Sequence, residues 1–138
     1  MTGKAFVDTN IFVYAALKPL DFPEKWRMAI ELLSSSRTFV VSTQVLNEFS
    51  AVLLRKNISD DDIKSRVEVI ATDSIVAEIT LETIRSTWEV RNRHKFSYWD
   101  SLIIASALQA GCTTLYTEDL THTMLLDKKL RIVNPFQP

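Results

Sequence analysis

The sequence is poor in the residues that cross-link a chain, break it into segments or bind zinc. It has 1 cysteine, Cys112, so no disulfide can form within the chain, which fits a reducing compartment. Its 2 histidines, His94 and His122, are far apart and lack the spacing of a zinc site. With only 2 glycines and 4 prolines, the chain contains no linker, low-complexity segment or internal repeat. We therefore expect a single domain over residues 1–138.

The chain also lacks a long apolar run and an excess of charge. No segment approaches the roughly 18 consecutive apolar residues that span a bilayer, and the N-terminus does not resemble a signal peptide. The formal net charge is −1, so the whole molecule does not attract nucleic acid. This disfavours a DNA-binding module that relies on a basic surface, but not an enzyme that contacts phosphates through metal ions. We expect a soluble, cytoplasmic protein with no membrane association.

Short apolar runs alternate with longer amphipathic segments along the chain. Strands are expected at residues 4–7, 38–42, 74–79, 114–116 and 130–133. Helices are expected at residues 10–17 (capped by Asn10), 23–35, 43–56, 59–70, 80–94 and 98–110, the last ended by Gly111. Strands separated by helices predict an α/β fold, a three-layer α/β/α sandwich around a mostly parallel sheet.

Acidic residues follow these strands or lie early in the helices after them. They are Asp8, Glu48, Asp100, Glu118 and Asp119. Such positions can converge at one edge of a parallel sheet, where α/β proteins bind their ligands. Clustered carboxylates repel one another unless a cation joins them, and oxygen ligands favour Mg²⁺ or Mn²⁺. Ions of this kind orient phosphates, generate hydroxide and stabilise leaving oxygens.

Each acid taken alone also has a structural explanation. Asp8 could form an Asx-turn after the strand that precedes it, and Glu48 could lie on the solvated edge of its helix. Asp100 could belong to a capping box at the start of its helix. Glu118 and Asp119 fit ordinary loop acids. The functional interpretation therefore depends on the joint pattern rather than on any one residue.

Four segments, in the same order, resemble the motifs of PIN domains. They are FVDTNI at 6–11, TQVLNE at 43–48, FSYWDSLIIASA at 96–107 and LYTEDL at 115–120. The match runs from about residue 4 to residue 135, and the chain looks most like the small VapC-like toxins of bacteria and archaea. That resemblance implies a Mg²⁺- or Mn²⁺-dependent endoribonuclease, the toxin of a type II toxin–antitoxin pair, that cleaves RNA with a metal-activated water. It also implies a homodimer that a cognate antitoxin holds inactive.

The resemblance assigns roles to individual residues. It implies that the catalytic and metal-binding acids are Asp8, Glu48, Asp100 and Asp119. Asp119 is favoured over its neighbour Glu118 because it lies two residues after Thr117, as the motif spacing suggests. Polar support for the acids would come from Asn10, Thr117 and Thr9.

A basic run precedes the third motif and could contact RNA phosphates. The candidates are Arg91, Arg93 and Lys95, which flank His94. The same residues could instead complement the C-terminal dipole of their own helix, and both interpretations remain open.

Other functions are also compatible with acids at strand ends. A haloacid dehalogenase-like enzyme would need a second acid where Asn10 stands, and a receiver domain would need a lysine after the 114–116 strand. The remaining alternative is a non-catalytic PIN-like module that binds RNA or protein without turnover.

Overall fold

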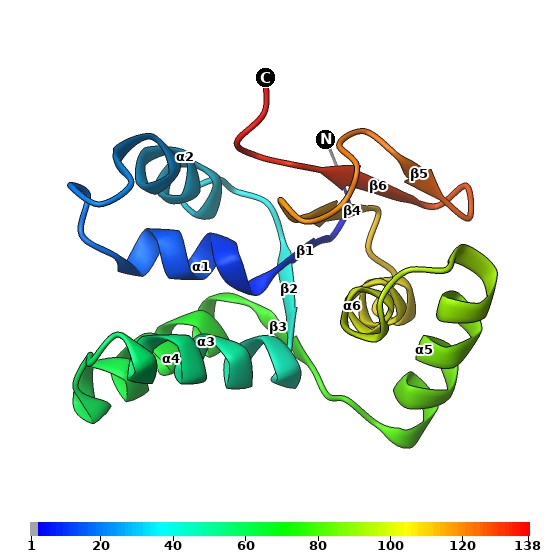
Figure 1. The fold of residues 1–138 in the computed structure, drawn as a ribbon, viewed down its shortest axis with the longest axis horizontal. Coiled ribbons are helices and arrows are strands. Elements are labelled where there is room, and N and C mark those ends of the chain that lie inside the picture. The colour runs from blue at the N-terminus through cyan, green and yellow to red at the C-terminus, as the bar shows by residue number, and fades with distance from the viewer. Residues whose placement is uncertain (1–2) are drawn as a thin grey trace.

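The computed structural model describes residues 3–138. Figure 1 shows a sheet with helices packed on both sides. The strands are β1 (Ala5–Val7), β2 (Phe39–Ser42), β3 (Ile75–Ala77), β4 (Thr114–Tyr116), β5 (Leu125–Leu126) and β6 (Leu130–Val133). The helices are α1 (Thr9–Ala16), α2 (Pro23–Leu33), α3 (Thr43–Arg55), α4 (Asp60–Asp73), α5 (Leu81–His94) and α6 (Tyr98–Gln109).

The sheet is mostly parallel, with the strand order β3-β2-β1-β4-β6-β5. Only the pairing of β5 with β6 is antiparallel among the pairings of the described residues. In Figure 1, α1 to α4 gather on one side of the sheet, and α5 and α6 lie on the other. The expected α/β sandwich with a mostly parallel central sheet is therefore confirmed.

The order in which the chain adds strands to the sheet reverses at β1, so the sheet has a topological switch point between β1 and β4. From β1 the chain adds β2 and then β3 outward on one side, and after α5 and α6 it returns to form β4 on the other side of β1. Val7 pairs with Tyr116, so the residues that follow β1 and β4 leave the sheet side by side. A crevice at such a switch point, at the carboxyl ends of the strands, is the usual ligand site of α/β folds.

The core is built from the central strands, from α6 and from the inner faces of α1 and α3. All residues of β1 and β2 are buried, as expected for strands covered on both faces. Seven consecutive residues of α6, Ser101 to Ala107, are buried, so this helix is enclosed on all sides. No helix in the described part of the chain is long and apolar enough to cross a membrane.

The start of α1 differs from the expectation. Asp8, not Asn10, is the N-cap: its backbone is extended (φ −75°, ψ 159°) and its Oδ1 accepts a hydrogen bond from the Thr9 amide at 2.7 Å. Asn10 lies inside the helix. Strand β1 ends at Val7, directly before Asp8, so the N-cap lies two residues earlier than predicted.

Three other differences concern α4, α5 and β5. Helix α4 continues to Asp73, three residues beyond the expected end, and the short strand β5 was not expected. Leu81 and Trp88 share a face of α5, as their spacing indicates, but that face is exposed, with 61% and 56% of these side chains accessible. The buried face of α5 carries Thr83 and Thr87 instead, and the Thr83 hydroxyl donates to the Gln109 side chain in α6 at 2.8 Å.

The end of α6 agrees with the expectation. Gly111 follows the C-cap residue with a φ of +72°, in the left-handed region that glycine adopts without strain. Cys112 then enters the core, where it packs as a small apolar residue.

Candidate functional site

Asp8 and Thr117 occupy the switch point between β1 and β4. Backbone hydrogen bonds extend past the strand ends, since the Asp8 amide donates to the Tyr116 carbonyl at 3.0 Å and the Thr117 amide to the Val133 carbonyl at 3.1 Å. The two side chains therefore face each other, and the Thr117 hydroxyl donates to Asp8 Oδ2 at 2.8 Å. The Asp8 side chain is 8% exposed and is held at both carboxylate oxygens.

Glu48 reaches the same place from α3. The hydroxyl of Thr9 donates to Glu48 Oε2 at 3.1 Å, which links the starts of α1 and α3. One turn earlier in α3, the Gln44 amide donates to Glu48 Oε1 at 3.2 Å. Gln44 was not among the candidate residues, although its i, i+4 spacing from Glu48 is a local signal that could have identified it.

Two further acids, Asp119 and Asp100, lie near Asp8 and Glu48. The Asp119 amide donates to the Thr117 hydroxyl at 3.2 Å, which ties this residue to the Asp8 partner, while its side chain is exposed. Asp100 lies in the first turn of α6, and its amide donates to the Ser97 hydroxyl at 3.1 Å. In a complete capping box the Asp100 side chain would also accept from the Ser97 amide, and this hydrogen bond is absent among the described residues. The Asp100 carboxylate therefore does not cap the helix.

The acids act on one another electrostatically. The pKa of Asp8 is raised from 3.8 to about 6, mainly by burial and to a smaller extent by the charges of Asp119 and Glu48. The hydrogen bonds from Thr117 and Thr9 lower the pKa and offset part of this rise. Burial also raises the pKa of Asp119, with the charges of Glu118, Asp100 and Glu48 acting in the same direction. Carboxylates from four segments therefore lie within electrostatic reach of one another.

The acids are near one another but do not form a closed ligand cage. Among the described residues, no group of three or more histidine, cysteine, aspartate or glutamate side chains converges closely enough to hold a metal ion. Mutual repulsion is the physical reason to expect like charges to stay apart when no cation joins them. The donors themselves are all oxygens, which is the chemistry that Mg²⁺ and Mn²⁺ prefer.

Glu118 points away from the acids and toward α1 and α2. Its Oε1 accepts from the Tyr14 hydroxyl at 2.9 Å, and its Oε2 pairs with the Lys25 ammonium at 2.9 Å. Both oxygens of Glu118 are therefore engaged, in contrast to those of Asp119. Tyr14 and Lys25 were not identified from the sequence, because no local spacing connects them with residue 118.

The remaining candidates have separate environments. The Arg91 guanidinium donates to the Phe96 carbonyl at 2.6 Å, and Arg93 forms an ion pair with Asp127 at 2.6 Å. Lys95 is the C-cap of α5, with a φ of 62°, and its ammonium makes no ion pair within residues 3–138. The side chain of Asn10 is likewise outside the hydrogen-bond network of the described acids.

The family model of the PIN domain matches residues 5–123, which is most of the sequence and includes all four acidic segments. The chain belongs to the PIN domain family. This confirms the family that the four motifs resemble. A search of curated proteins gave no match.

Solved structures of toxins and toxin–antitoxin complexes share this PIN fold. VapC20 of Mycobacterium tuberculosis, described as a toxin that cleaves the sarcin–ricin loop, has a TM-score of 0.66 and 22% identity over 83% of this chain and 89% of that one. A toxin–antitoxin complex from Klebsiella pneumoniae has a TM-score of 0.68 and 17% identity over 95% and 97% of the two chains. VapBC2 from Rickettsia felis, bound to a DNA fragment from its promoter, has a TM-score of 0.66 and 20% identity over 95% and 99%. At these identities the likeness establishes the fold.

Proposed function

We propose that this PIN domain is a metal-dependent endoribonuclease and the toxin of a toxin–antitoxin pair. The observation that carries the proposal is the gathering of Asp8, Glu48, Asp100 and Asp119 around one switch point. Burial, and after it the charges of neighbouring acids, raises the pKa of both Asp8 and Asp119 there. Fold neighbours described as toxins or toxin–antitoxin complexes support the biological role. The substrate would be RNA, and the partner would be a cognate antitoxin.

The four acids are suited to hold Mg²⁺ or Mn²⁺. Each carboxylate oxygen has two lone pairs, so Asp8 can accept its bonds from Thr9 and Thr117 and still offer a lone pair to a cation. The side chains would have to close around the ion, and neutralisation of their repulsion would drive this closure. The chemistry supplied there when Mg²⁺ or Mn²⁺ is bound is orientation of a phosphate, acidification of water and stabilisation of a leaving oxygen.

The protein's own residues have distinct tasks in this proposal. Asp8 is the fixed member, because Thr9 and Thr117 hold both its oxygens. Glu48 is oriented by Thr9 and Gln44 from the α3 side. Asp119 is exposed whereas Asp8 is buried, so a polynucleotide could reach Asp119 from solvent. Since Glu118 is bound to other groups, Asp119 is the better candidate for the fourth acid.

Metal-dependent cleavage is the direct test. Structured RNA should be cut in the presence of Mn²⁺ or Mg²⁺ and remain intact with EDTA, and the products should carry 5′-phosphate and 3′-hydroxyl ends. Asp8→Asn should abolish cutting, whereas Asp21→Asn, in an exposed loop, should leave it unchanged. Tight RNA binding without cutting, at every metal concentration, would instead favour a non-catalytic binding module.

The assembly state is a separate part of the proposal. We expect a homodimer, and sedimentation velocity would distinguish it from a monomer. A short reading frame for a DNA-binding protein immediately upstream of the gene would support the antitoxin, and co-expression of the two products should suppress RNA cleavage.

A further inference from the structure

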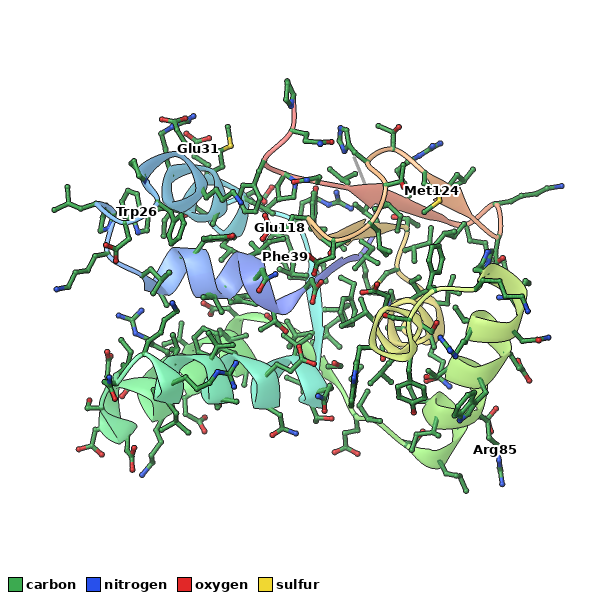
Figure 2. The ribbon with its side chains drawn as sticks, in the orientation of Figure 1. Trp26, Glu31, Phe39, Arg85, Glu118 and Met124 are labelled. Carbon is green, nitrogen blue, oxygen red and sulfur yellow. The ribbon has the colours of Figure 1, made fainter. Side chains whose placement is uncertain are left out.

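Four side chains from distant parts of the chain form a closed cluster beside the acids, which we call the Lys25 clamp: Tyr14, Lys25, Glu118 and Phe136. The Lys25 ammonium pairs with Glu118 Oε2 at 2.9 Å and donates to the Tyr14 hydroxyl at 3.2 Å. The Tyr14 hydroxyl closes the ring by donating to Glu118 Oε1 at 2.9 Å. Figure 2 shows Glu118 where α1 and α2 approach the sheet.

Two aromatic rings lie beside the ammonium group of the clamp. Lys25 Nζ lies 4.8 Å from the centre of the Tyr14 ring and 5.4 Å from that of Phe136. The Tyr14 and Phe136 rings pack edge to face at 5.3 Å, so the segment after β6 covers the cluster. Cation–π contacts and the ion pair together restrict a side chain that would otherwise be mobile.

The clamp acts on the segment that carries Asp119. Thr117 is tied to Asp8 on one side, and Glu118 is tied to Tyr14 and Lys25 on the other. Asp119 follows directly, and its carboxylate makes no hydrogen bond within residues 3–138. The position of the Asp119 carboxylate is therefore set by the anchoring of its two predecessors.

We propose that Lys25 is a positioning residue which, through Glu118, holds Asp119 against the other acids. This inference rests on the proposed nuclease function. Without Lys25, the Glu118 carboxylate would be released beside the acid cluster, and it could take the place of Asp119 or repel it.

Direct contact of Lys25 with RNA phosphates is the competing role, and the geometry disfavours it. The charge of Lys25 is already neutralised by Glu118, and the hydrogen bond to Glu118 raises the pKa of the ammonium. The ammonium already donates to Glu118 and to Tyr14, so a phosphate could use only its third N–H and would lie beside the negative Glu118 carboxylate. A positioning role predicts an effect on kcat and on metal affinity without RNA, whereas a phosphate contact predicts an effect on KM and on the salt dependence of binding.

The test compares three variants that keep the local charge balance: Tyr14→Phe, Phe136→Ala and the double variant Lys25→Met/Glu118→Gln. Each should lower kcat about tenfold or more, because a misplacement of about 1 Å can cost up to about a hundredfold, and KM should change less than about threefold. Titration calorimetry with Mn²⁺ and no RNA should show a Kd that is weaker by about tenfold or more. Lys25→Arg, which keeps the charge and can pair with Glu118, should recover most of the kcat that Lys25→Met loses.

The single variants Lys25→Met and Glu118→Gln should not add their effects, since both residues act through one contact. Lys64→Met, an exposed lysine of α4, is the matched control and should match the wild type in every assay. A rise in KM with unchanged kcat and unchanged Mn²⁺ affinity would overturn the positioning role in favour of a phosphate contact. Full additivity of the two single variants would overturn it as well.

Failure of the proposed function can be separated from failure of this inference. If the wild type neither cuts RNA nor binds Mn²⁺, hydrogen exchange still reports the clamp. The amide of Asp119, which donates to Thr117, should then exchange about tenfold faster in the Lys25→Met/Glu118→Gln variant, with the β1 amides unchanged. Equal exchange in both proteins would show that the clamp does not hold this segment.

Discussion

Replacing Asp8 with asparagine should make the metal-free protein more stable at neutral pH. The carboxylate is almost fully buried at the switch point, and burial together with Asp119 and Glu48 raises its pKa from 3.8 to about 6. That rise corresponds to about 3 kcal/mol of destabilisation by the ionised form, at about 1.36 kcal/mol per pKa unit. Asparagine removes the charge and retains an oxygen that can accept from the Thr9 amide.

The sign of the pH dependence follows from proton binding. The unfolded chain releases the Asp8 proton near pH 3.8 and the folded chain near pH 6, so the folded state holds more protons between these values. The free energy of unfolding of the wild type should therefore fall as pH rises through this window and level off above it. The asparagine NH2 group can donate to the Thr117 hydroxyl oxygen, but the hydroxyl proton then loses the acceptor that Asp8 provided, which costs about 1 kcal/mol. The expected net gain of the variant is about 2 kcal/mol at pH 7.5.

Urea denaturation in EDTA, repeated between pH 4.5 and pH 8, measures this difference. Asp8→Asn should have a higher midpoint than the wild type at pH 7.5 with the same slope, and the gap should shrink or reverse at pH 4.5. Asp21→Asn, an exposed loop acid, is the control and should follow the wild type throughout. A variant that is less stable at pH 7.5, or a gap independent of pH, would refute the claim that the buried charge is unfavourable.

Three further predictions concern metal, Asp100 and the basic run. Mn²⁺ at a hundred times its Kd should stabilise the wild type by about 2.7 kcal/mol in thermal unfolding and leave Asp8→Asn unchanged, and equal shifts would place the ion elsewhere. Asp100→Asn should abolish cleavage and leave metal-free stability equal or slightly higher, whereas lost stability with retained activity would assign Asp100 to helix capping. Lys95→Ala should flatten the salt dependence of RNA binding more than Arg93→Ala, because Arg93 is already in an ion pair, and two unchanged slopes would remove this run from the RNA path.

The sequence was sufficient for the parts of the fold that depend on local patterns. Buried strands are short and apolar, so β1, β2 and β4 were located within a residue or two. The convergence of Asp8 and Thr117 could also be anticipated, because residues that follow neighbouring parallel strands leave the sheet at the same edge.

Other features depend on contacts that no local pattern encodes. Glu118 is bound by Tyr14 and Lys25, which are 104 and 93 positions away in the sequence, so its difference from Asp119 could not be derived from spacing. Periodicity correctly grouped Leu81 with Trp88 on one face of α5, but it does not say which face of a helix is buried. The buried face combines Val90 with Thr83 and Thr87, and the Thr83 hydroxyl bonds to α6, a contact that the hydrophobic pattern does not indicate.

The acidic site and the Lys25 clamp are two solutions to the same electrostatic problem. Adjacent carboxylates at residues 118 and 119 repel each other, and the charge of Glu118 is the first of the charges that raise the pKa of Asp119, after burial. Lys25 neutralises one of the pair and opposes this rise, which leaves the other free for a ligand. Two neighbouring acids thereby acquire different roles, because within residues 3–138 Glu118 forms an ion pair with a lysine and Asp119 does not.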